Sequence, residues 1–261
     1  MLHRLCWCCI LTAAYLGLRR GAWWRPLLRD RRLMLMLCGS GALIGLNWFL
    51  FIWGVNAGHV VEVSLGYYIN PLINVLMGTI LLGERLQRTQ IFAVALAALG
   101  VAWLTMAFGR PPWIALALGL TFGSYGLLRK LMNVESIPGL AMESTLLFPA
   151  AAAYLLWLQW QGTAAFAAGE PLIDTLLVAG GLVTALPLIL FAYGARRIPY
   201  SSLGMIQYIT PSMQLGIGVL VFGEPFDSGR LAGFACIWLA LAIYTADGLR
   251  RLSRSASRPA G

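Results

Sequence analysis

Uncharged polar side chains recur at helical spacing in two apolar stretches, and these residue types could hydrogen-bond a solute. Residues four apart share a helix face, so the first stretch, 67–74, places Asn70 and Asn74 together. The second stretch, 207–214, offers polar side chains at the same spacing. The alternative is that Asn74 and Gln214 only join helices by hydrogen bonds. The two faces predict a substrate cavity with aromatic walls, formed by Asn47, Trp48, Tyr67, Tyr68, Asn70, Asn74, Gln207, Tyr208 and Gln214.

Three glutamates are candidates for coupling or gating, because an ionisable side chain inside hydrocarbon is costly. Glu143 is interpreted as a proton-coupling carboxylate or a clamp for a cationic group, or as a side chain that reaches the membrane interface. Glu62 has the same interfacial alternative. Glu84, beside Arg85, is either part of a solvated cluster or half of a gate ion pair.

Two prolines lie several residues inside apolar stretches. Pro71 and Pro211 each remove one backbone hydrogen bond and free a carbonyl in the preceding turn. A matched pair of interrupted helices is a good sequence pointer to a transport site. The alternative is that both helices are kinked only for packing.

The sequence lacks the residue patterns of intramembrane enzymes. Only two histidines occur, His3 and His59, and no H-E-x-x-H pattern is present. A zinc site would need a second cysteine pair besides the one in residues 6–9, and there is none. We therefore predict no enzyme activity, no metal and no cofactor.

Composition indicates a membrane protein. The 261 residues are 59% hydrophobic and 11% charged, whereas soluble domains carry about 25% charged residues. The net charge of +9 is then no signal for nucleic acid, because basic residues mark cytoplasmic loops in membrane proteins. We predict an all-α, polytopic helical bundle with nine spans, at about 2–18, 33–55, 60–82, 90–108, 112–130, 141–160, 172–195, 201–223 and 230–249.

The basic residues predict the orientation. Alternation through nine spans puts 16 of the 19 basic residues on one side, among them Arg129 and Lys130. By the positive-inside rule this side is cytoplasmic and contains the C-terminus.

The polar stretches belong to an internal duplication. At an offset of 140, residues 41–105 and 181–245 share 15 identities in 65 positions, including Gly83-Glu84 with Gly223-Glu224. The matched spans cross in opposite directions, as in inverted-repeat transporters. We predict an incomplete N-terminal repeat of four spans (1–108), a C-terminal repeat of five spans (112–249) and a basic cytoplasmic tail (250–261). The first helix of a ten-span, two-times-five arrangement is expected to be missing.

Residues 47–56, 62–76 and 83–85, followed by Tyr125-Gly126-Leu127-Leu128-Arg129-Lys130 and 207–211, resemble the RarD-type permeases. These are EamA-domain members of the drug/metabolite transporter superfamily. Leu2-His3-Arg4 resembles the start of the family's second helix. The resemblance implies a multi-pass bacterial inner-membrane permease of small molecules, drugs or metabolites with a chloramphenicol-sensitivity label.

The resemblance and the repeat together predict secondary-active transport by alternating access. The expected partners are the lipid bilayer and an unidentified small molecule. Proton coupling is one role for the glutamates, and the chain is expected to be a monomer or homodimer without nucleic acid. The alternative is a truncated membrane protein that does not transport.

Overall fold

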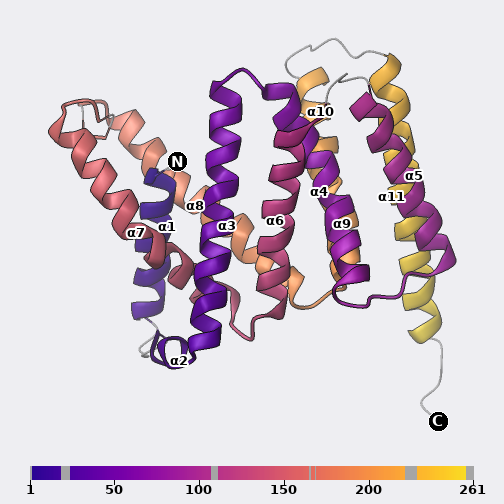
Figure 1. The fold of residues 1–261 in the computed structure, drawn as a ribbon, viewed down its shortest axis with the longest axis horizontal. Helices are drawn as coiled ribbons and strands as arrows, with labels where there is room; N and C mark the ends of the chain where they lie inside the picture. Colours follow the sequence, from indigo (N-terminus) through magenta and orange to yellow (C-terminus); the bar gives the residue numbers. More distant parts are fainter. Residues whose placement is uncertain are drawn as a thin grey trace. The chain divides into compact units, whose positions relative to one another are not determined.

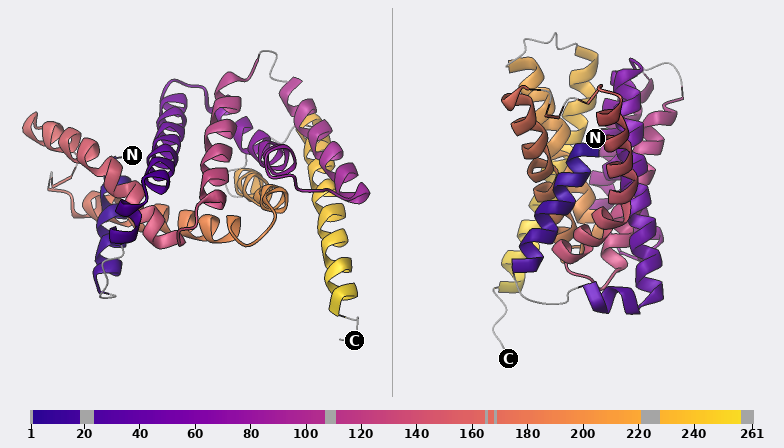
Figure 2. Two further views of the ribbon diagram at one scale, coloured as in Figure 1. Left: turned by 60° about the horizontal axis from the view of Figure 1, so that its bottom comes forward. Right: turned by 90° about the vertical axis from the view of Figure 1, so that its left-hand side faces the viewer.

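The structure is a computed structural model that describes residues 2–18, 24–106, 111–164, 166–167, 169–220 and 228–256. Its regular elements are α-helices joined by short connections (Figures 1 and 2). They are α1 (Leu2–Leu18), α2 (Trp24–Arg29), α3 (Arg31–Asn56), α4 (Val60–Ile80), α5 (Arg88–Met106), α6 (Trp113–Leu131), α7 (Ser136–Trp160), α8 (Pro171–Ala195), α9 (Tyr200–Gln207), α10 (Ile209–Leu220) and α11 (Ser228–Ala256).

The all-helical prediction is confirmed for the described residues. Six helical segments are long and apolar enough to cross a membrane: Arg31–Asn56, Val60–Ile80, Arg88–Met106, Ser136–Trp160, Pro171–Ala195 and Leu231–Arg250. The other predicted spans, at 2–18, 112–130 and 201–223, contain α1, α6 and the pair α9 and α10, but the count of nine spans stays a prediction. The short helix α2 was not expected from hydropathy.

The predicted span at 201–223 is divided where α9 ends. Pro211 has no N–H to donate to the carbonyl of Gln207 four residues earlier, so the α-helical ladder is interrupted there. Tyr208 instead donates its N–H to the carbonyl of Met205 at 3.2 Å, which closes α9. In contrast, α4 continues as one helix past Pro71.

The chain forms two compact units, each built from two separate segments. Unit 1 contains Met1–Ile52 and Ser124–Arg197, and unit 2 contains Trp53–Gly123 and Ile198–Gly261. Each unit therefore takes helices from both halves of the sequence. The predicted division between residues 108 and 112 concerns the sequence repeat and stays a prediction.

In unit 1, α1 packs on α7 and α8. Thiol–hydroxyl contacts join Cys8 to Ser144 at 3.5 Å and Cys9 to Thr145 at 3.6 Å. A second apolar cluster contains Leu5, Cys6 and Ala151, with Trp48 of α3 packed against it.

In unit 2, α4 packs on α5, α9 and α10, and α5 packs on α11. The end of α4 lies at the start of α9, so these two helices run in opposite directions (Figure 1). The helices α5 and α11 are also antiparallel, because Gly100 lies near Ile237 and Leu104 near Gly233. The hydrophobic core of unit 2 consists of Leu65, Ile69, Ile73, Val75, Ala93, Ala97, Val101, Ala115, Met205, Tyr208, Ile237, Ala240 and Tyr244.

Candidate functional site

Three amide side chains of unit 2 meet where α9 ends. Asn70 and Asn74, one turn apart on α4, both donate their Nδ2 hydrogens to Oε1 of Gln207, at 2.9 Å and 2.6 Å. Gln207 is the last residue of α9, beside the interruption at Tyr208. The structure thus brings together one predicted polar residue from the second stretch and two from the first. We call these three side chains the amide cluster.

The amide cluster retains unused hydrogen-bonding capacity. Asn74 is fully buried, and within the described part of the chain Oδ1 of Asn70 and Oδ1 of Asn74 have no hydrogen-bond partner. A buried acceptor without a donor costs about 1–3 kcal/mol. The two oxygens therefore keep unused capacity to accept hydrogen bonds.

Close helix packing surrounds Asn74. A Cβ added to Gly204 of α9 would lie 2.6 Å from the carbonyl oxygen of Pro71 and 3.0 Å from Cβ of Asn74. On the α6 side, Gly123 accepts a hydrogen bond from the hydroxyl of Tyr200 at 2.6 Å through its carbonyl. The cluster therefore lies between closely packed backbones, which fix the orientation of its amides.

The predicted aromatic residues of unit 2 lie on the same helices. Tyr67 and Tyr68 are half-buried on α4, and the Tyr68 ring meets the Phe234 ring edge-on at 5.2 Å between centroids. Tyr208 is fully buried at the helix interruption. Pro211 is also buried. Gln214, in contrast, is exposed on α10 and is not part of the amide cluster.

The two remaining predicted substrate residues belong to unit 1. Asn47 and Trp48 are half-buried on α3. Trp48 packs against the cluster that contains Leu5 and Ala151. Both residues therefore belong to unit 1, whereas the amide cluster belongs to unit 2.

Glu143 of unit 1 lies inside a buried polar cluster. Because α7 begins at Ser136, seven residues earlier than Glu143, the carboxylate sits about two turns into the helix and is 1% exposed. Its Oε1 accepts a hydrogen bond from Ser40 of α3 at 2.5 Å and lies 3.6 Å from Nη1 of Arg129 of α6. The phenol of Tyr125 is a further neighbour. In this structure Glu143 is enclosed by protein groups and does not reach an interface.

Arg129 is the site residue that the sequence analysis missed. Its position at the end of an apolar run placed it among the loop residues, yet it is 1% exposed. Its Nη2 donates to the carbonyl of Ser136 at 3.0 Å. A Cβ at Gly139 would overlap its guanidinium group, so the bare glycine backbone makes room for this side chain. A signal available from sequence was Gly139 in the first turn of the following helix.

Glu62 and Glu84 of unit 2 accept hydrogen bonds from the first turns of other helices. Oε1 of the buried Glu62 accepts from the N–H of Ile114 at 2.8 Å, at the start of α6. The two carboxylate oxygens of Glu84 accept from the N–H groups of Tyr200 at 2.5 Å and Ser201 at 2.8 Å, at the start of α9. A negative charge at a helix N-terminus is stabilised by the free N–H groups and the helix dipole.

The backbone conformation of the α4–α5 connection places Glu84 at the start of α9. Gly83 adopts a φ of +67°, a left-handed conformation that glycine enters without steric cost. The Glu84 N–H then donates a hydrogen bond to the carbonyl of Gly78 at 3.0 Å. The matched residue Glu224 lies outside the described residues.

Among the residues that the structure describes, no three His, Cys, Asp or Glu side chains lie close enough to hold a metal ion. The five cysteines are free thiols.

Together, the helical architecture and its six membrane-length apolar helices define a multi-pass membrane protein. The chain belongs to the EamA-like transporter family, whose model matches residues 2–106 and 111–246. It is 46% identical over 257 residues to "Protein RarD" of Streptomyces exfoliatus, covering 98% of this chain and 82% of that protein. It is 36% identical to "Chloramphenicol-sensitive protein RarD" of Pseudomonas aeruginosa, covering 92% and 79%. The resemblance to RarD-type permeases is thus confirmed.

A solved structure shares the fold. A chain described as "Crystal structure of protein" aligns with a TM-score of 0.66 and 20% sequence identity, covering 94% of this chain and 87% of that chain. At this identity the likeness concerns the fold alone.

Proposed function

We propose that this protein is a secondary-active permease of small molecules in a bacterial inner membrane, and not an enzyme. The observation that carries the proposal is the amide cluster, in which buried hydrogen-bond acceptors lie beside an interrupted helix. Interrupted helices at membrane depth are tolerated where they line a solute or water site. No nucleotide-binding pattern occurs in the sequence, so the proposed energy source is an ion or solute gradient.

The proposed mechanism is alternating access between two inverted repeats. The offset of 140 matches α4 with the α9–α10 segment and α5 with α11. Both matched pairs are in antiparallel contact within unit 2, as an inverted repeat requires. In such a protein the matched helices exchange conformations between the inward-open and outward-open states. The interruption that divides α9 from α10 while α4 stays continuous is the kind of difference that this exchange would reverse.

The amide cluster favours an uncharged polar substrate. Its members offer amide donors and acceptors, and the carboxylates of unit 2 nearest in sequence, Glu62 and Glu84, are engaged at helix N-termini. Chloramphenicol, which appears in the name of one relative, is an uncharged amide and is therefore a suitable first probe.

We further propose that Glu143 is the coupling carboxylate. It is buried beside Arg129, so protonation would leave the guanidinium without its charge partner and would favour a rearrangement of α6 against α7. The competing role is a permanent tie between these helices, which would leave transport independent of a proton gradient.

The test is uptake into proteoliposomes that contain the purified chain. Labelled chloramphenicol and a panel of uncharged metabolites are supplied with and without an imposed proton gradient. Asn74→Ala and Gln207→Ala are expected to lower uptake about tenfold, because each removes a hydrogen bond to a buried site. Gln159→Ala is the control, since Gln159 is an exposed amide on α7 and is not a candidate substrate residue.

Folded Asn74→Ala and Gln207→Ala proteins that transport as well as the unmodified chain would exclude the amide cluster as the substrate site. If uptake is the same with and without the proton gradient, both in the unmodified chain and in Glu143→Gln, proton coupling is excluded. These outcomes separate the binding proposal from the coupling proposal.

A further inference from the structure

Two glutamates tie the two ends of α4 to neighbouring helices of unit 2. Near the first end, Oε1 of Glu62 accepts a hydrogen bond from the N–H of Ile114 in the first turn of α6. Beyond the other end, the carboxylate of Glu84 accepts hydrogen bonds from two N–H groups in the first turn of α9. The amide cluster joins α4 to the last residue of α9, between these ends. It therefore lies between two contacts of the same chemical kind.

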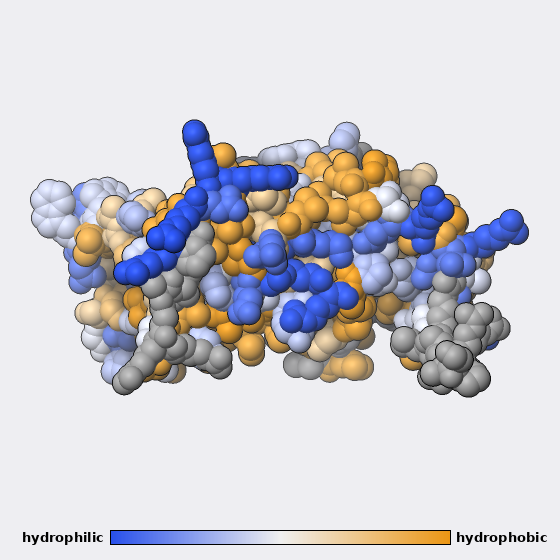
Figure 3. All heavy atoms as spheres, turned by 90° about the horizontal axis from the view of Figure 1, so that it is seen from below, coloured by the Kyte–Doolittle hydropathy of each residue, from blue (hydrophilic) through white to orange (hydrophobic). Residues whose placement is uncertain are grey.

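The two contacts differ in burial. Glu62 is 1% exposed, so a break of its hydrogen bond would remove a partner from a carboxylate that water does not reach. Glu84 is only half-buried, and the next residue, Arg85, is exposed. The side of Figure 1 at which α4 ends and α9 begins carries hydrophilic side chains when it is seen from below (Figure 3). Water can therefore replace the N–H donors of Glu84, but not that of Glu62.

A tyrosine holds the start of α9 from a second side. Tyr200, the first residue of α9, is fully buried, and its hydroxyl donates a hydrogen bond to the carbonyl of Gly123 in α6 at 2.6 Å. The backbone of α4 also comes close, because a Cβ added to Gly78 would lie 2.7 Å from Oε2 of Glu84. These contacts fix the start of α9 against both α4 and α6.

The other end of α9 has the properties of a hinge. The helix has eight residues and ends at Gln207, where Pro211 interrupts the α-helical ladder. Residues at the end of a helix are the places where a change of φ and ψ lets a segment turn as one body. Farther along α9, Ser202 shares a hydrogen bond of 3.1 Å with the hydroxyl of Tyr244 in α11. A single side-chain contact of this kind can be exchanged for another.

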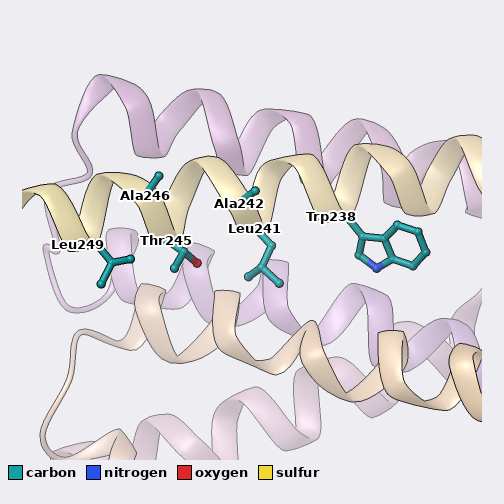
Figure 4. A pocket seen from close by; sticks show the side chains of 6 residues that line it. All are labelled: Trp238, Leu241, Ala242, Thr245, Ala246 and Leu249. Atoms are coloured by element: carbon teal, nitrogen blue, oxygen red, sulfur yellow. The ribbon is translucent and has the colours of Figure 1, made fainter.

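An open pocket flanks α9 on the side of α11. It has a volume of about 410 Å³ and is lined by Trp238, Leu241, Ala242, Thr245, Ala246 and Leu249 (Figure 4). At one end of the pocket, Nε1 of Trp238 donates a hydrogen bond to the hydroxyl of Ser212 in α10 at 2.9 Å. The pocket therefore lies beside the α9–α10 segment, and α9 has room to turn on this side.

We propose that α9 is a gate for the amide cluster and that Glu84 is its latch. With the latch closed, the start of α9 lies against α4 and α6 and covers the cluster from the Glu84 end. When Glu84 exchanges the N–H groups of Tyr200 and Ser201 for water, α9 turns about the interruption at Tyr208 and opens a path to the cluster. The contact between Glu62 and α6 is kept in both states. The inference rests on the proposed function, because the gated site is the proposed substrate site.

Thiol labelling of the full chain in nanodiscs tests the latch. Met205→Cys places a thiol on α9 beyond its first turn, where the native side chain is 1% exposed. Val63→Cys places a thiol beside Glu62, at a position that is 2% exposed. Each protein is treated with a water-soluble maleimide, and peptide mass spectrometry follows the label at each position. The half-buried native Cys236 of α11 is the internal reference.

We expect Glu84→Ala to speed labelling at position 205 about tenfold, the factor that corresponds to about one net hydrogen bond. Labelling at position 63 and at Cys236 should be unchanged. Tyr200→Phe keeps the buried ring and removes only its hydrogen bond to α6, and it should also speed labelling at position 205. Glu62→Ala is the contrasting variant and should leave position 205 unchanged.

Unchanged labelling at position 205 in both Glu84→Ala and Tyr200→Phe would overturn the proposal, as would an equal acceleration there by Glu62→Ala. If Glu84→Ala also speeds labelling of Cys236, general unfolding is responsible, and the Tyr200→Phe result decides. The labelling does not depend on transport. Accelerated labelling in a protein that takes up no solute would support the latch and contradict the proposed function. Uptake without accelerated labelling would do the reverse.

Discussion

The contact between Glu84 and the start of α9 yields the sharpest prediction. The Glu84 carboxylate is the group that accepts hydrogen bonds from the N–H groups of both Tyr200 and Ser201. Glu84→Ala removes both acceptors and leaves these N–H groups at the helix terminus to water. The first turn of α9 should then open more often than in the unmodified chain.

The size of the effect follows from the geometry. A hydrogen bond to a charged group contributes about 1.5–3 kcal/mol, and loss of an N-cap side chain costs about 0.5–2 kcal/mol. Glu84 is only half-buried, so screening by solvent reduces the upper values. We therefore expect about 2 kcal/mol for Glu84→Ala, which is about a 30-fold change in the local opening equilibrium. Glu84→Gln keeps one acceptor oxygen and should lose about half of this free energy.

Hydrogen–deuterium exchange in nanodiscs measures this opening directly. The peptide that covers 198–207 should exchange about 30-fold faster in Glu84→Ala, while peptides of α5 and α11 should be unchanged. Glu135→Ala is a matched control, because Glu135 occupies the N-cap position of α7 and its side chain makes no capping hydrogen bond. If residues 198–207 keep their protection in folded Glu84→Ala protein, the carboxylate does not stabilise α9 and the reasoning is refuted.

Three further predictions concern stability, measured as the free energy of unfolding in mixed micelles. Arg129→Gln should lower the free energy of unfolding by about 3–5 kcal/mol, because it leaves Glu143 buried without its charge partner. Adding Glu143→Gln should recover part of this loss. If the losses of the two single variants simply add in the double variant, the two side chains are not coupled. Gly204→Ala should cost about 1–3 kcal/mol, because the added Cβ would meet the carbonyl oxygen of Pro71. Gly216→Ala, which has open space around it, should be neutral or stabilising. Equal effects of the two substitutions would contradict the close approach of α9 to α4. Glu62→Ala should cost about 1–2 kcal/mol and speed amide exchange at the start of α6, and unchanged exchange there would exclude the cap.

The helices were predictable because hydropathy and length are local properties of the sequence. The interruption of α9 was only half predictable. Pro211 and Pro71 carry the same local signal, yet the chain is divided after Gln207 and continuous through Pro71. Each proline removes the same kind of backbone hydrogen bond, so packing against neighbouring helices decides whether a helix bends or divides.

The shared face of Asn70 and Asn74 was predictable from their spacing, and the second copy of the repeat placed Gln207 on a polar face expected to meet it. Their role in substrate binding stays a prediction. The partners of Glu62 and Glu84 were not predictable, because they are backbone N–H groups 52 and 116 residues away. A backbone donor leaves no side-chain signature in the sequence. Arg129 was missed because a charge at the end of an apolar run looks the same whether it reaches solvent or turns inward.

The interleaving of the two units has a consequence for how this protein assembles. Unit 1 needs residues 124–197 to join 1–52, and unit 2 needs 198–261 to join 53–123. The ribosome therefore releases no complete unit when the first half of the chain is made. Helices of the first half therefore remain in the bilayer without their packing partners until the second half has been synthesised. A chain divided near residue 110 should regain its structure only when both fragments are produced together in the same membrane.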